Sequence, residues 1–193
     1  GEWIKLLVEM GLEEEARQLG EAFTLVKPND LDLIEEMTHL AADFNDYHSA
    51  AAYAGQLCAL RPEDPACHRL LAQQWEALSK WEEAYQERSA AVESASQPNL
   101  NDFVKLAAAA LQTRQWEKTE AACKKGLELH PDHGKMMAML GKAYFEQGKM
   151  EEAAVLLNRA TLVEPEIADA WKDLAAYYTK LGNDQKALET LRA

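Results

Sequence analysis

Prolines at one fixed interval are the feature of this sequence that most restricts its fold. Pro28 and Pro62 are 34 residues apart, and so are Pro131 and Pro165. The 69 residues between Pro62 and Pro131 equal two such intervals plus one residue, which we place in the turn-rich segment 97–99. A period of roughly 20–50 residues is typical of stacked repeats. The sequence therefore predicts an array of repeated units.

Two further sets of positions keep this interval, with the same extra residue between the third and fourth units. One set consists of residues with small side chains, and the other, three residues earlier, consists of aromatic or bulky residues. Two antiparallel helices joined by a short turn can cross closely only where the contact residue is small, so the small set predicts a helix crossing in each unit. The small set is Ala16, Ala50, Ala84, Thr119, Ala153 and Ala187, and the bulky set is Tyr47, Trp81, Trp116 and Met150.

Segment 134–164 shows two helices in one unit. Gly148 interrupts its apolar pattern and suits a helix C-cap, and Pro165 ends the second helix because proline cannot continue one. Apolar residues on either side of Gly148 recur at the helical spacing of i, i+3, i+4 and i+7. They are Met137, Leu140, Gly141 and Tyr144, and then Ala153, Leu156, Leu157 and Ala160.

These residues resemble a known repeat. Leu140-Gly141-x-x-Tyr144, followed by Ala153 and Pro165, is similar to the tetratricopeptide pattern W-x-x-L-G-x-x-Y, then A, then P. The last unit has the tryptophan and departs at the glycine, whereas the second unit is degenerate. These two units read Trp171-x-x-Leu174-Ala175-x-x-Tyr178 and Ile34, Met37, Thr38, Ala41.

The resemblance covers essentially the whole chain. It implies an all-α fold, an α-α superhelix (solenoid) of tetratricopeptide-type antiparallel helix pairs, forming a single repeat array over 1–193. We expect twelve helices, the last one short, in an array truncated at both ends, with weak self-association through its unsealed C-terminal stub. The six units lie near 1–30, 31–64, 65–99, 100–133, 134–167 and 168–193.

Charge and composition restrict the partners. The net charge is −13, and an acidic surface repels nucleic acid and anionic membranes. No apolar run approaches the roughly 20 residues that span a bilayer. An odd number of cysteines, three, does not suit a disulfide framework. This count favours a reducing compartment such as the cytoplasm. We therefore expect a protein or peptide partner, with no nucleic acid and no membrane.

The sequence predicts no enzyme, no cofactor and no metal site. It contains no nucleophile motif and no phosphate-binding glycine loop. Cys58 and Cys67 are nine residues apart, outside the C-x2-4-C spacing of zinc sites, so these cysteines and the adjacent His68 are interpreted as a chance cluster with free thiols. His130-Pro131-Asp132-His133 lies at an expected turn, where His and Asp cap helices.

In the tetratricopeptide family the first helix of each unit lines a concave groove, and its side chains that are not used in packing become candidate contacts. In the second unit these are acidic, whereas later units supply cations suited to acidic side chains or a C-terminal carboxylate. The candidate groove residues are Arg69, Gln73, Asn101, Lys105, Lys135, Met139, Lys142 and Lys172.

One subfamily binds chaperone tails through a carboxylate clamp of Lys, Asn and Arg. Lys135 fits one clamp lysine, but Met139 stands at an arginine position and Lys105 at an asparagine position. The clamp is therefore not reproduced. The leading hypothesis is a protein-interaction scaffold. The alternative is the non-catalytic, partner-selecting arm of a larger enzyme, and RNA binding, a third class, is opposed by the negative charge.

Overall fold

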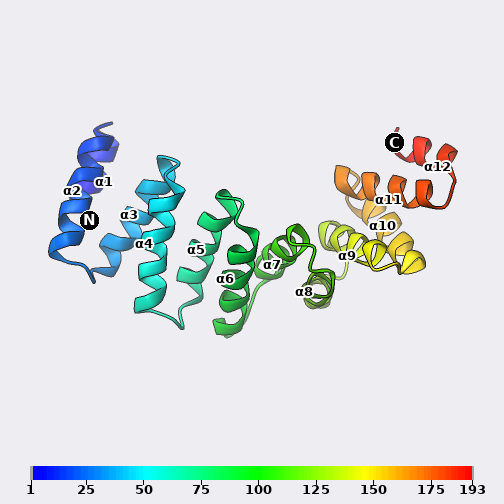
Figure 1. Ribbon diagram of the computed structural model, residues 1–193, viewed down its shortest axis with the longest axis horizontal. Coiled ribbons are helices and arrows are strands. Elements are labelled where there is room, and N and C mark those ends of the chain that lie inside the picture. Colours follow the sequence, from blue (N-terminus) through cyan, green and yellow to red (C-terminus); the bar gives the residue numbers. More distant parts are fainter. Residues whose placement is uncertain (1, 193) are drawn as a thin grey trace. The chain divides into compact units, whose positions relative to one another are not determined.

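The computed structural model describes residues 2–192, and within them the chain forms twelve α-helices and no strand (Figure 1). The predicted all-α fold of helix pairs, with a short last helix, is confirmed. The helices are α1 (Glu2–Glu9), α2 (Glu13–Val26), α3 (Leu31–Asp43), α4 (Tyr47–Leu60), α5 (Pro65–Ala77), α6 (Trp81–Ser94), α7 (Leu100–Gln112), α8 (Trp116–Leu129), α9 (Gly134–Glu146), α10 (Met150–Val163), α11 (Ala168–Lys180) and α12 (Asp184–Thr190).

The helices follow the period of the sequence. From the second unit on, the first helices begin at Leu31, Pro65, Leu100, Gly134 and Ala168, in steps of 34, 35, 34 and 34 residues. The one longer step contains the linker 95–99 between α6 and α7. The extra residue therefore lies in a loop, where it leaves the helical register intact.

The turn inside each helix pair has a recurrent backbone structure. One residue in each of the six turns has a positive φ, and the N–H of the following residue donates to the carbonyl five residues earlier, as Lys149 does to Tyr144 at 2.9 Å. This is the 6→1 bond of a Schellman C-cap. The predicted cap at Gly148 is confirmed, and the equivalent residues are Gly11, Asn45, Ser79, Arg114 and Gly182.

The small residues form the helix crossings, as predicted. Ala16, Ala50, Ala84, Thr119 and Ala153 are 0% exposed, and Ala187 is buried. The crossing of α9 and α10 shows how close the helices are, because a Cβ placed on Gly141 would lie 2.8 Å from Leu157 Cγ. No larger residue fits there without movement of its neighbour.

The described chain divides into two compact units, one with α1–α6 and one with α7–α12, at Ser96–Gln97. The core of the N-terminal unit includes one cluster around Met37 and another around Ile34 and Leu71. In the C-terminal unit each helix contacts the next, and α9 also contacts α7 and α11. The first helices of that unit are therefore neighbours. A single continuous array remains a prediction. None of the described helices is long and apolar enough to cross a membrane.

Candidate functional site

Three first helices of the C-terminal unit, α7, α9 and α11, border a groove of about 880 Å³. On each helix the lining residues recur at i, i+3 and i+4, so they share one helical face. The floor is apolar and includes buried Met139, and polar or charged side chains form the rim. The floor is Ala108, Leu111, Ala138, Met139, Ile167, Ala168 and Ala176, and the rim is Gln112, Lys135, Lys142, Asp169, Lys172 and Asp173.

Two rim lysines are paired with aspartates of α11. Lys142 Nζ lies 2.6 Å from Asp173 Oδ1, and Lys172 Nζ lies 3.1 Å from Asp169 Oδ1. Burial raises the pKa of Asp173, whose side chain is 15% exposed, and the hydrogen bond from Lys142 partly offsets that rise. Lys135 is exposed and has no ion pair with any described residue. It is therefore the rim cation best placed to meet an anionic ligand.

The predicted groove residues separate into three groups. Lys135, Met139, Lys142 and Lys172 are brought together around the groove. Asn101 and Lys105 lie on α7 but do not line it. Arg69 and Gln73 lie on α5, in the N-terminal unit.

Sequence reasoning missed the apolar floor apart from Met139. Ala108, Leu111 and Ala138 are spaced as core residues are, and only their position on first helices distinguishes them. Ile167 lies in the loop before α11. The pairing of Lys142 and Lys172 with aspartates was also not anticipated, so the groove is less basic than its lysines suggest.

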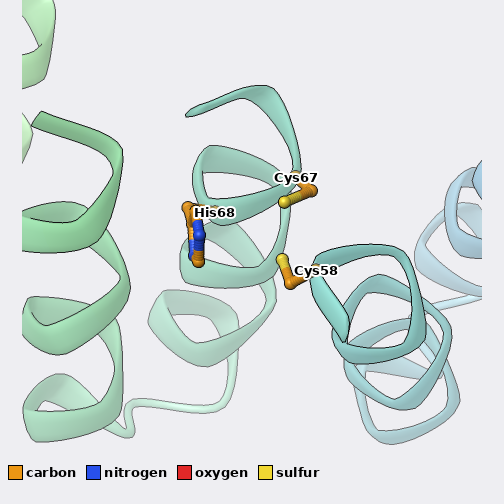
Figure 2. Close-up of side chains that lie close together, drawn as sticks. All are labelled: Cys58, Cys67 and His68. Carbon is orange, nitrogen blue, oxygen red and sulfur yellow. The ribbon is translucent and has the colours of Figure 1, made fainter. Parts of the chain in front are cut away.

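A second group of side chains lies in the N-terminal unit. Cys58 is in the last turn of α4, and Cys67 and His68 are in the first turn of α5, on the two sides of turn 61–64. Their potential ligand atoms all lie within 4.8 Å of one another (Figure 2). Cys58 is 9% and Cys67 5% exposed, and the His68 side chain is 14% exposed. The expected free thiols are confirmed, but the helix-to-helix turn assembles donors that their sequence spacing does not indicate.

Hydrogen-bond acceptors surround this cysteine–histidine cluster. The Cys67 thiol is within donating distance of the carbonyls of Asp64, at 3.0 Å, and Arg61, at 3.3 Å. His68 Nδ1 lies 2.7 Å from Glu87 Oε2, and Nε2 lies 2.9 Å from the Pro62 carbonyl.

These surroundings shift the pKa values of the cluster upward. Burial raises the pKa of the Cys58 and Cys67 thiols. Burial alone would lower the pKa of His68, but its hydrogen bonds to Glu87 and Pro62 outweigh burial and raise that pKa. Both thiols are therefore protonated at neutral pH.

The ligand-rich segment 130–133 caps a helix, as expected. His133 Nδ1 accepts a hydrogen bond from the Met136 N–H at 3.3 Å at the start of α9. Asp132 pairs with Arg159. These side chains stabilise a turn.

Comparison with known proteins gives consistent results. Residues 68–192 match the family described as the middle TPR-like domain of cilia and flagella-associated protein 70, where TPR denotes tetratricopeptide repeat. A TPR repeat-containing protein of Bacillus subtilis, YvcD, is 24% identical over 97% of this chain, which spans 37% of the length of that relative.

Among solved structures, MamA from Desulfovibrio magneticus (residues 41 to the end) aligns with a TM-score of 0.76 at 13% identity, covering 85% of this chain and 92% of that one. YrrB, described as a TPR protein with an unusual peptide-binding site, aligns with a TM-score of 0.70 at 20% identity, covering 90% of each chain. At these identities the similarity shows the fold alone.

Proposed function

This chain belongs to the family of tetratricopeptide-like domains, and we propose that it is an interaction scaffold that binds a segment of a partner protein between α7, α9 and α11. The observation that carries the proposal is the groove of about 880 Å³, bordered by three first helices. Ligand sites are typically concave and mostly apolar, with a few polar groups that fix orientation. The floor with Met139 and the rim with Lys135 have this composition.

The charges of the rim favour an acidic segment or a free C-terminal carboxylate. Three lysines and two aspartates line the groove, which leaves a formal charge of +1 inside a chain of net charge −13. Lys135 is exposed and is not paired with a described aspartate or glutamate, so pairing with a ligand breaks no existing ion pair. Lys142 and Lys172 already have aspartate partners, and a ligand carboxylate would have to compete with them. The described peptide-binding site of YrrB supports a peptide ligand for this fold.

The test is a set of peptide-binding titrations. Peptides with an apolar centre are compared in three forms, with acidic residues and a free C-terminus, with the same residues and an amidated C-terminus, and with basic residues. We expect the acidic free-carboxylate form to bind most tightly and to weaken as salt is added.

Two variants locate the ligand. Ala176→Trp fills the groove from an exposed position on α11 and should abolish binding. Lys135→Glu should weaken binding about two- to fivefold, the usual range for an exposed ion pair. The matched control is Lys125→Glu, at another exposed lysine, which lies on α8 outside the groove. Equal loss in Lys135→Glu and Lys125→Glu, or full binding by Ala176→Trp, would contradict the proposal.

A further inference from the structure

We propose that Cys58, Cys67 and His68 form a binding site for a thiophilic divalent cation, with zinc as the probe. Thiolate sulfur and imidazole nitrogen are the usual zinc donors. Here two thiols and one imidazole converge from α4 and α5, with all ligand atoms within 4.8 Å of one another. This site lies in the N-terminal unit, apart from the groove of the C-terminal unit.

The donors need little movement to bind one ion. Two zinc–sulfur bonds of about 2.3 Å at a tetrahedral angle place the sulfurs about 3.8 Å apart. Because the present separations are at most 4.8 Å, the donors have to approach by no more than about 1 Å. Figure 2 shows the sulfurs of Cys58 and Cys67 in the space between their two helices.

The surroundings favour a positive charge at this place. The carbonyl oxygens of Arg61, Pro62 and Asp64 contact the cluster, and the Glu87 carboxylate contacts His68. The carbonyl oxygens are the negative ends of dipoles and the carboxylate has a full negative charge, so all of these groups stabilise a cation. Both ring nitrogens of His68 face hydrogen-bond acceptors, so the orientation of the ring is fixed in the metal-free protein.

The same surroundings argue against a redox or nucleophilic role for the thiols. Reactive cysteines lie in electropositive sites that stabilise the thiolate. Acceptor oxygens around Cys67 do the opposite, and burial keeps both thiols protonated. A divalent cation changes this balance because it stabilises both thiolates directly.

Zinc binding displaces protons from the groups that coordinate the ion. Two S–H bonds break, two sulfur–zinc bonds form, and His68 gives up one proton as one ring nitrogen coordinates the ion. These protons pass to solvent, so zinc affinity should fall with decreasing pH. The other ring nitrogen keeps its hydrogen bond to Glu87 or to the Pro62 carbonyl, which orients the ring. Access is from the side of His68, the most exposed of the three donors.

The consequence for the scaffold is a cross-link between successive repeats. Cys58 belongs to the second helix of one repeat, and Cys67 and His68 to the first helix of the next. An ion held by both helices stabilises the folded joint by mass action. Zinc would therefore fix α4 against α5.

The experiment uses the whole chain, reduced with a phosphine and freed of metal. Cobalt(II) reports thiolate ligation through its sulfur-to-metal charge-transfer band, and zinc affinity is read by competition with a chromophoric chelator. We expect one equivalent to bind with the band present, and a higher melting temperature with zinc. Cys58→Ala/Cys67→Ala should lose the band and the shift in melting temperature. The control Cys123→Ala, at a buried cysteine on α8 outside the cluster, should keep both.

One more variant guards against loss of the fold in the double cysteine variant. His68→Asn leaves both buried thiols in place and should weaken zinc binding at least about tenfold. The proposal is overturned if the folded wild-type chain shows no charge-transfer band. It is equally overturned if the band survives in Cys58→Ala/Cys67→Ala, or if His68→Asn binds zinc as the wild type does.

Discussion

Two glycines inside helices should respond oppositely to the same substitution. Gly55 lies in α4, and a Cβ added there would have no neighbour within 4 Å. Gly141 lies in α9, where an added Cβ would be 2.8 Å from Leu157 Cγ and 3.4 Å from the Ala153 carbonyl oxygen. Because both sites are helical, the gain in helix propensity from Gly to Ala is the same, about 1 kcal/mol.

The difference between the two variants isolates the helix crossing. Gly55→Ala should stabilise the fold by about 1 kcal/mol, the propensity gain alone. Gly141→Ala adds an overpacking cost of about 1–3 kcal/mol, because Leu157 is 0% exposed and its branch point has no free space. Its net effect is therefore between neutral and about 2 kcal/mol of destabilisation.

Urea unfolding followed by far-ultraviolet circular dichroism measures both changes, and the slope of the transition should stay constant. Because the glycines lie in different compact units, amide hydrogen exchange in α4 and in α9 assigns each change to its own unit. In a Leu157→Ala background, Gly141→Ala should become stabilising, since the clashing atoms are gone. If Gly141→Ala stabilises the wild-type chain as much as Gly55→Ala does, the close crossing of α9 and α10 is wrong.

Three other changes test the turns, the charge network and the exposed face of α12. Arg114 holds a left-handed backbone conformation, φ 56°, so Arg114→Gly should raise stability by about 1 kcal/mol in urea unfolding, whereas loss of stability would contradict the strain. Glu120 accepts hydrogen bonds from Lys124 and Lys149, which lower its pKa to about 2. Its stabilisation is therefore fully present above its ordinary pKa of 4.5 and lost as pH falls to about 2. Glu120→Gln should cost about 1 kcal/mol at neutral pH and make acid unfolding in that window shallower, and an unchanged pH profile would contradict the network. Leu188 is 56% exposed on α12, and sedimentation should show weak self-association that Leu188→Glu removes.

The fold was predictable because every repeat packs its two helices with the same residue types at equivalent positions. The period, together with the two helical stripes of segment 134–164, predicted twelve helices, and the set of small residues predicted the crossing at Ala153. Side-chain pairing inside the groove was not predictable in this way. Lys142 and Asp173 are 31 residues apart, and their contact depends on the rotamers of two long or buried side chains on neighbouring first helices. A pattern of residue types contains no information on that choice.

The cysteine–histidine cluster could have been found from the period, by asking which positions meet at the joint between repeats. Cys58 is the twelfth residue of its helix, and Cys67 and His68 are the third and fourth residues of the next one. At the equivalent positions of the other joints inside the two units, no cysteine or histidine occurs. The fold therefore accepts apolar or hydroxyl residues at these positions and does not require donors. Cysteine can replace a small hydrophobic residue there. The position of His68 otherwise holds isoleucine, methionine or tryptophan, and a histidine there adds two polar nitrogens that the packing between repeats does not require. The equivalent sets are Thr24 with Leu33 and Ile34, Leu127 with Met136 and Met137, and Thr161 with Ala170 and Trp171.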